Sequence, residues 1–233
     1  MNKSFKQKKL VLESAISAHE IDRSLHYSIV EGTYSTVMGS LTGGVFLTGF
    51  ALSLGAGNFE IGLLAAIPAL ASFIQIPASY FVEQSGKRRK ISLRAAVIAR
   101  SLWIPIALLP ILALGYGQNY VVSIFLGLIF IYALVNSVNG LAWLSWLSDL
   151  VPKERMGNFF AKRTMVNNGI AMLLGIGAGQ LIDTGYHLLA GQAIFAFSAL
   201  FVLAVLSGMI SVHFLAKMVE PPAHKLHPKE SFL

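Results

Sequence analysis

Long apolar stretches separated by short polar segments dominate this chain of 233 residues. Because about 20 helical residues cross the hydrocarbon core of a bilayer, six of these stretches are long enough to span a membrane. They are expected at residues 27–54, 59–82, 91–114, 120–147, 164–182 and 188–217. The pattern predicts an all-α integral membrane protein, in which a six-transmembrane-helix bundle is closed by short turns.

The two ends of the chain are polar. Residues 1–26 carry acidic side chains such as Glu13 and Glu20 between their apolar positions, whereas a secretory signal would have an unbroken apolar core. This segment is expected to form either a short amphipathic helix on the cytoplasmic membrane surface or a partly ordered tail. Residues 218–233 contain consecutive prolines and are expected to be a cytoplasmic tail or the start of an interdomain linker.

The composition supports a membrane location. Hydrophobic residues make up 55% of the chain and charged residues only 12%, against about 25% charged in soluble domains. The net charge of +7 would suggest nucleic acid in a soluble protein, but here it points to the lipid bilayer as partner. The chain has no cysteine, and its histidines lack metal-site spacing, so no cofactor and no metal are expected.

The 18 lysines and arginines are distributed unevenly. None lies in the turns at 55–58, 115–119 or 183–187; they occupy both ends of the chain, the turn at 83–90 with the adjoining helix, and the loop at 153–163. Since cytoplasmic loops carry the excess of Lys and Arg, both termini are expected in the cytoplasm. The expected location is the inner membrane of a bacterium.

A dense basic turn, residues 79–90, joins the second and third stretches. It resembles the signature loop of the major facilitator superfamily, Gly-x-x-x-Asp-Arg-x-Gly-Arg-Arg. Glu83, Gly86, Lys87 and Arg88 stand at the acid, the central glycine and the basic pair, while Ser79 and Gln84 replace the first glycine and the first cation. The segment 149–163 is similar to that family's loop between helices four and five, and Leu54-Gly55-Ala56 is similar to its first outer turn.

This resemblance implies the N-terminal half of a secondary transporter, whose substrate site lies between two six-helix halves. The chain would be either a fragment or truncated product, or a half that pairs with a second half or with a copy of itself. The resemblance also implies a cytoplasmic gate. Its candidate residues are Glu83, Gly86, Lys87, Arg88, Asp149 and Arg155.

Polar residues in the fourth and first stretches are candidates for a substrate cavity. Tyr132, Asn136, Asn139 and Trp143 recur at helical spacing, which suits a wet wall, although the amides could instead bond neighbouring helices and Trp143 could belong to an interfacial belt. In the first stretch, Glu31 could carry a proton or balance a cationic substrate, or it could lie in the cytoplasmic interface. The candidate cavity residues are Glu31, Thr42, Tyr132, Asn136, Asn139 and Trp143.

Arg100 is the most costly residue for a membrane helix, since it follows Lys90 by ten residues, roughly 15 Å at helical rise. Structural pairing of Arg100 is favoured over contact with substrate. The possible partners are Glu31, Glu83 and Asp149.

The expected function is secondary active or facilitative transport of a small-molecule substrate by alternating access. The alternative is a non-transporting scaffold or assembly protein with the same half-fold. An enzyme is least supported, because the chain lacks clustered catalytic acids, a Ser/His pair or metal ligands at useful spacing.

Overall fold

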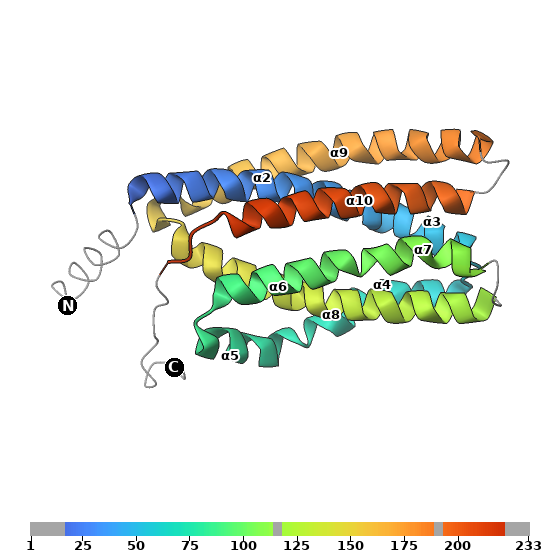
Figure 1. Ribbon diagram of the computed structural model, residues 1–233, viewed down its shortest axis with the longest axis horizontal. Helices are drawn as coiled ribbons and strands as arrows, with labels where there is room; N and C mark the ends of the chain where they lie inside the picture. Colours follow the sequence, from blue (N-terminus) through green and yellow to red (C-terminus); the bar gives the residue numbers. More distant parts are fainter. Residues whose placement is uncertain (1–16, 114–117, 189–192, 222–233) are drawn as a thin grey trace.

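The computed structural model describes residues 17–113, 118–188 and 193–221, which are almost entirely helical. The helices lie side by side along one long axis (Figure 1). They are α2 (Ala18–Thr42), α3 (Gly44–Ser53), α4 (Asn58–Ser72), α5 (Gln75–Ser85), α6 (Arg88–Ser101), α7 (Trp103–Ala113), α8 (Gln118–Leu150), α9 (Met156–Leu188) and α10 (Ala193–Ala216), with a 3₁₀ turn η1 (Lys153–Arg155) before α9.

Six helical segments are long and apolar enough to cross a membrane, as in a multi-pass membrane protein. The first three segments each join two helices, and the last three are formed by α8, α9 and α10. Their bounds are Ala18–Ser53, Asn58–Ser85, Arg88–Ala113, Tyr120–Leu150, Lys153–Thr184 and Ile194–Ala216. The predicted number of spans is therefore confirmed within the described part of the chain.

Glycine or proline accompanies each break inside the first three spans. Gly44 has a φ of +52°, in the left-handed region, at the junction of α2 and α3. Pro77 and Pro105 follow the other two breaks, and a proline ring displaces the carbonyl group four residues before it. Those carbonyls belong to Phe73, at the end of α4, and to Ser101, the last residue of α6.

The N-terminal boundary differs from the prediction. Ser17 caps α2: its hydroxyl accepts from the Glu20 amide at 3.2 Å, and its own amide donates to the Glu20 carboxylate at 2.9 Å. The helix then runs without a break through residue 27 to Thr42. Residues 17–26 are thus continuous with the first span instead of forming a separate surface segment, and residues 1–16 lie outside the described chain.

The fifth span also begins and ends differently. Helix α9 starts at Met156, not at residue 164, and it continues through the turn predicted at 183–187 to Leu188. Its first turns are polar enough to resemble a loop, yet Met156, Phe159 and Phe160 share one helix face and pack beside Trp146. At the C-terminal end, Met218 is 1% exposed; the predicted tail is described only as far as residue 221.

The contacts between helices repeat. Helix α2 packs against α9 and α10, just as α8 packs against α4–α5 and α6–α7, while α10 and α6–α7 pack against each other. The same pairs of spans remain in contact if the first span is exchanged with the fourth, the second with the fifth and the third with the sixth. Because α2 and α8 run in opposite directions, this contact pattern is the one expected of two triplets arranged as an inverted repeat (Figure 1).

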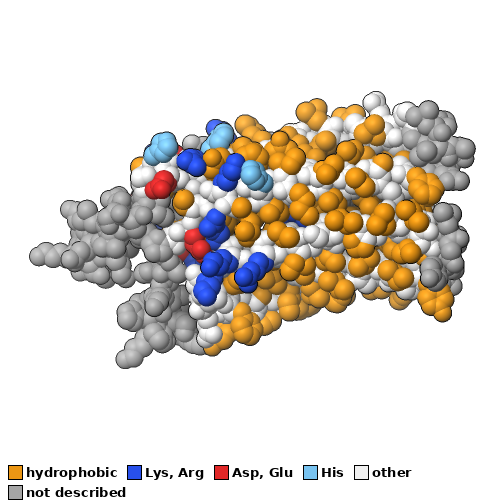
Figure 2. All heavy atoms as spheres, viewed as in Figure 1, with side chains coloured by type: hydrophobic (Ala, Val, Ile, Leu, Met, Phe, Trp, Pro, Cys, Tyr) orange, Lys and Arg blue, Asp and Glu red, His pale blue; other side chains and the backbone are white. Residues whose placement is uncertain are grey.

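Charged side chains gather at one end of the bundle, where α2 begins and α10 ends, and apolar side chains cover most of the remaining face (Figure 2). We call this the charged end. The large apolar residues elsewhere on the surface include Val45, Phe73, Ile111 and Leu173, each at least 60% exposed. Such a surface suits lipid contact, since hydrocarbon does not penalise exposed apolar side chains.

Candidate functional site: a buried charged layer

A polar layer separates two apolar clusters in the interior. Along α2, Glu31 lies between Leu25 of the cluster near the charged end and Met38 of the other cluster. Along the third span, Arg100 lies between Ala96 and Trp103 of the same two clusters. We call the group of Glu31, Arg100, Arg163 and Ser211 the charged layer.

The Glu31 carboxylate is the centre of this layer, with its side chain only 5% exposed. Arg163 Nη2 donates to Oε2 at 2.9 Å. Arg100 Nη2 lies 3.6 Å from Oε1, and Ser211 donates to the same oxygen at 3.1 Å. Ser211 Oγ in turn accepts from Arg100 Nη2 at 2.8 Å. Both carboxylate oxygens are thereby paired, as a buried charge requires.

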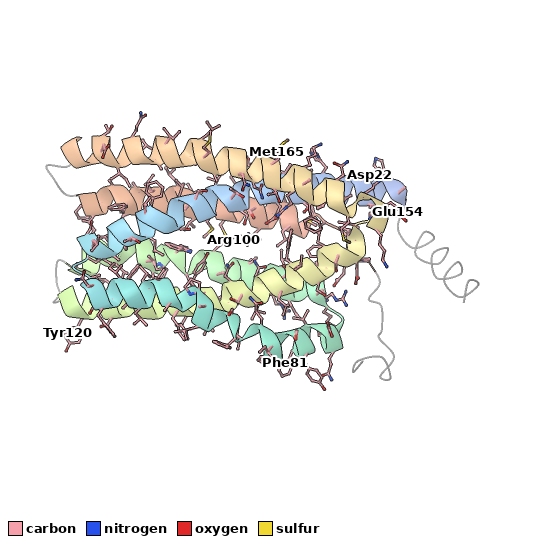
Figure 3. The ribbon with its side chains drawn as sticks, turned by 180° about the vertical axis from the view of Figure 1, so that it is seen from behind. Asp22, Phe81, Arg100, Tyr120, Glu154 and Met165 are labelled. Carbon is pink, nitrogen blue, oxygen red and sulfur yellow. The ribbon has the colours of Figure 1, made fainter. Side chains whose placement is uncertain are left out.

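Arg100 reaches this position from α6, near the middle of the bundle's length (Figure 3). Its stem lies against Gly208 of α10, where an added Cβ would stand 3.1 Å from Arg100 Cδ. Among its three predicted partners, the structure pairs Arg100 with Glu31. An arginine at this depth is expensive without such a partner, so α6 and α10 are held against α2 by electrostatics as well as packing.

Arg163 extends from α9 across α2 to α8. Its Nε donates to the Ser28 carbonyl at 3.3 Å, and its Cζ lies 4.4 Å from the centroid of the Trp143 ring. This cation–π distance is well within the favourable range. Gly32 makes the crossing possible, because a Cβ there would lie 2.7 Å from Arg163 Nε and Nη2. One guanidinium therefore connects three membrane-spanning helices.

The charges in this layer do not balance. Two guanidinium groups share one carboxylate, and within the described chain no second carboxylate lies within 4.0 Å of either arginine. The described residues also contain no group of three or more His, Cys, Asp or Glu side chains that could hold a metal ion. The charged layer therefore carries two guanidinium groups for its one carboxylate.

The predicted cavity residues occupy different surroundings. Glu31 and Trp143 meet through Arg163, whereas Asn139 accepts from the Ser92 hydroxyl at 2.9 Å and so bonds α8 to α6. Tyr132 packs edge-on against Trp103 at a ring-centroid distance of 5.3 Å. Thr42 is buried and donates to the Met38 carbonyl at 2.8 Å in its own helix, and Asn136 is exposed.

The six predicted gate residues do not form one network. Arg88 pairs with Asp149, joining α6 to the end of α8, and Arg155 pairs with Asp22 at 2.9 Å. Gly86 ends α5 with a φ of +60°, a conformation that favours glycine. Glu83 and Lys87 are exposed and make no ion pair with another described residue.

A further connection at the charged end was not predicted. The Arg89 amide donates to Glu220 Oε1 at 3.0 Å, and the Arg89 guanidinium donates to the Ala216 carbonyl. An acid therefore lies at the N-terminus of α6 and a cation at the C-terminus of α10, as the helix dipoles favour. This pair ties the third span to the sixth.

Sequence reasoning also missed the inward position of Arg163 and the role of Ser211. Arg163 was assigned to a polar loop, but the helical spacing of Met156, Phe159 and Phe160 continues to it and could have placed it two turns into a helix. Ser211 follows Ser207 by one helical turn, and Ser207 donates to the Tyr34 carbonyl at 2.8 Å. That spacing indicates a polar stripe on α10 facing α2.

Comparisons of the chain with protein-family models, with curated proteins and with solved structures gave no match.

Proposed function

We propose that this chain works as one half of a secondary transporter, which moves a small solute across a membrane by alternating access, either coupled to an ion gradient or by facilitated diffusion. The observation that carries the proposal is the inverted pairing of helix contacts between the first and last three spans. Inverted repeats are a common basis of transporter folds, because two equivalent packings allow the protein to open toward either side. The resemblance of residues 79–90 and 149–163 to the major facilitator superfamily supports the same proposal.

The second half is proposed to cover a face that this bundle leaves open. In the apolar stretch of α9 only 6% of the residues are buried, whereas 50% are buried in that of α6–α7. Helix α9 therefore lies at the edge of the bundle. Asn136 of α8 is exposed too, although an amide has no partner in lipid. A second six-helix bundle, from a longer chain or a second copy, would place these groups at a wet interface.

The charged end provides contacts that could change as the halves rock. The Arg155–Asp22 pair is 65% and 60% exposed at its two side chains, so it can break and reform at little cost. The charged layer behaves oppositely, since it joins α2, α6, α9 and α10 through buried bonds and would move as a unit. The distribution of cations favours a cytoplasmic position for the charged end.

Water access along α8 tests the proposal directly. The chain has no cysteine, so Asn136→Cys is a single reporter, and Ile131→Cys, at a position 48% exposed, is its lipid-facing control. We expect a membrane-impermeant maleimide to modify the Asn136 variant in both inside-out and right-side-out vesicles, and the Ile131 variant in neither. Modification of Asn136→Cys from neither side, or from one side only, would contradict alternating access.

Uptake by purified protein in proteoliposomes provides the second test. Labelled sugars, amino acids, amines and carboxylates form the panel, and protein-free liposomes are the control. Transport predicts saturable uptake of at least one class. A scaffold or assembly protein predicts no uptake of any class and protection of Asn136→Cys when its partner protein is bound.

A further inference from the structure

We infer that the Arg163 guanidinium, together with the unpaired donors of Ser28 and Trp143, binds the carboxylate group of a small organic anion, which would make carboxylates the substrate class of the transporter. This inference rests on the proposed function and deepens it. Three features support it: unbalanced charge, unpaired buried polar atoms, and access to one of the two arginines.

The charge argument follows from the pairing of Glu31. Its two oxygens are already engaged, Oε2 with Arg163 and Oε1 with Arg100 and Ser211. One positive charge in this layer therefore lacks a counter-ion among the described residues. An unpaired cation between membrane-spanning helices is costly, and an anion that binds there removes this cost. A cationic solute would add to it.

Buried polar atoms without partners belong to two residues that contact Arg163, Ser28 and Trp143, and to Asn167 on the same helix. Ser28 is 0% exposed, and its hydroxyl makes no hydrogen bond although its carbonyl receives the Arg163 Nε bond. The indole Nε1 of Trp143, whose ring lies under the guanidinium, is also buried without a partner. So is Oδ1 of Asn167, one helical turn beyond Arg163 on α9. Each lacks a partner within the described chain, which is uncommon for buried polar groups.

These atoms suit a carboxylate better than a cation. The Ser28 hydroxyl and the Trp143 N–H are donors, and Arg163 Nη1 forms no bond with any described residue. These three donors come from α2, α8 and α9, and a carboxylate offers two oxygens to accept from them, including the charge-assisted bonds that arginine forms best. The Asn167 amide would remain for a polar substituent of the same molecule, and the Trp143 ring would supply an apolar wall.

Exposure distinguishes the two arginines. The Arg163 side chain is 17% exposed and that of Arg100 only 7%, so Arg163 is the more accessible of the two. Because residue 32 is a glycine, the Arg163 side chain can pass close to α2 and reach Trp143. Arg163 is therefore the binding group, and Arg100 holds Glu31 in place behind it.

Thermal unfolding of the purified full chain, followed by tryptophan fluorescence in detergent, tests this site. The probes are acetate, lactate and succinate, compared with inorganic phosphate and choline at constant ionic strength. We expect at least one carboxylate at millimolar concentration to raise the Tm by several degrees, and choline to have no effect. The proposal is overturned if no carboxylate stabilises the protein or if phosphate alone does.

Variants assign the binding to this site. Arg163→Met should abolish the carboxylate shift, whereas Lys153→Met, which removes an exposed cation at the charged end, should keep it. Trp143→Phe preserves the aromatic wall and removes one donor, so the carboxylate Kd should rise about tenfold. Trp146→Phe is its control, because that indole already donates to the Val219 carbonyl at 2.9 Å. Equal carboxylate affinity in the Trp143 and Trp146 variants would contradict the site even if Arg163→Met failed to fold.

The uptake assay separates this inference from the proposed function. Uptake of a neutral or cationic solute that carboxylates do not inhibit, and that Trp143→Phe does not change, would support transport and overturn the anion site. Carboxylate binding that depends on Arg163, without uptake of any solute, would overturn transport and leave the binding site established.

Discussion

Ion pairs of the same chemical kind occupy two very different regions of this protein. In the charged layer, the side chains of Arg100 and Glu31 are 7% and 5% exposed. At the charged end, those of Arg155 and Asp22 are 65% and 60% exposed. Both are arginine–carboxylate pairs that connect segments far apart in sequence. The difference between them shows that the surroundings, and not the residue types, decide what a pair contributes.

The physical reason is the fate of a charge when its partner is removed. At the charged end water solvates the remaining group, so an exposed pair typically contributes less than about 1 kcal/mol. In the charged layer no other described carboxylate can replace Glu31 beside Arg100, and a buried charge left unpaired costs about 3–5 kcal/mol. The first pair can therefore act as a reversible contact, whereas the second holds helices together.

Removing the central acid should have the largest effect. Glu31→Gln leaves the buried Arg100 and the partly buried Arg163 without a counter-ion, and we expect the free energy of unfolding to fall by about 3–5 kcal/mol. Denaturant unfolding of purified protein in detergent micelles measures this loss. Glu31→Asp is the control, since it keeps the charge. A loss below about 1 kcal/mol for Glu31→Gln would show that the buried pair contributes no more to stability than an exposed pair.

Displacing Arg163 without changing any charge should have an intermediate effect. In Gly32→Ala the new Cβ would lie 2.7 Å from Arg163 Nε and Nη2, so the guanidinium must move away from Glu31 and Ser28. We expect a destabilisation of about 1–3 kcal/mol, as for other overpacked interiors. Gly39→Ala on the same helix meets no atom within 4 Å and should be neutral or stabilising by up to about 1 kcal/mol. Equal effects of the two changes would show that Arg163 does not need the space at Gly32.

Breaking the exposed pair should have the smallest effect. Asp22→Asn is expected to change the free energy of unfolding by less than about 1 kcal/mol, and the change should shrink in 1 M salt because the Debye length there is about 3 Å. The same titration at low and high salt measures both quantities. The effect of Glu31→Gln should depend less on salt, since the side chains of Glu31 and Arg100 are only 5% and 7% exposed. Equal salt dependence of the two variants would indicate that the Glu31–Arg100 pair is open to solvent.

Much of the fold could be predicted from hydropathy, because the cost of placing a residue in hydrocarbon depends mainly on that residue and its neighbours. The six spans and the gathering of cations at one end follow from such local costs. The start of α9 could not be read in this way. Residues 156–163 mix apolar side chains with Asn158, Lys162 and Arg163, and they are helical because Met156, Phe159 and Phe160 join the apolar cluster that contains Trp146.

The prolines do not all have the same effect. Proline can kink or break a helix, yet α4 continues through Pro68, whereas the chain breaks near Pro77. Helix α7 likewise continues through Pro110. Membrane helices tolerate proline where neighbouring groups satisfy the freed carbonyl, so whether a proline breaks a helix depends on its tertiary surroundings.

The candidate site, too, could be predicted from the sequence only in part. Arg100 needs a partner at its depth, and Glu31 was among the three acids that the sequence made available. Which acid it meets, and that Arg163 shares the same carboxylate from 132 residues away, depended on how α2, α6, α9 and α10 pack. By itself, the sequence determined that the chain must place six helices and one costly arginine in a membrane, because burial energy is local. Only the tertiary structure decided which charges meet. Pairing requires contact between helices, and the spacing of residues along the chain does not specify which helices are neighbours.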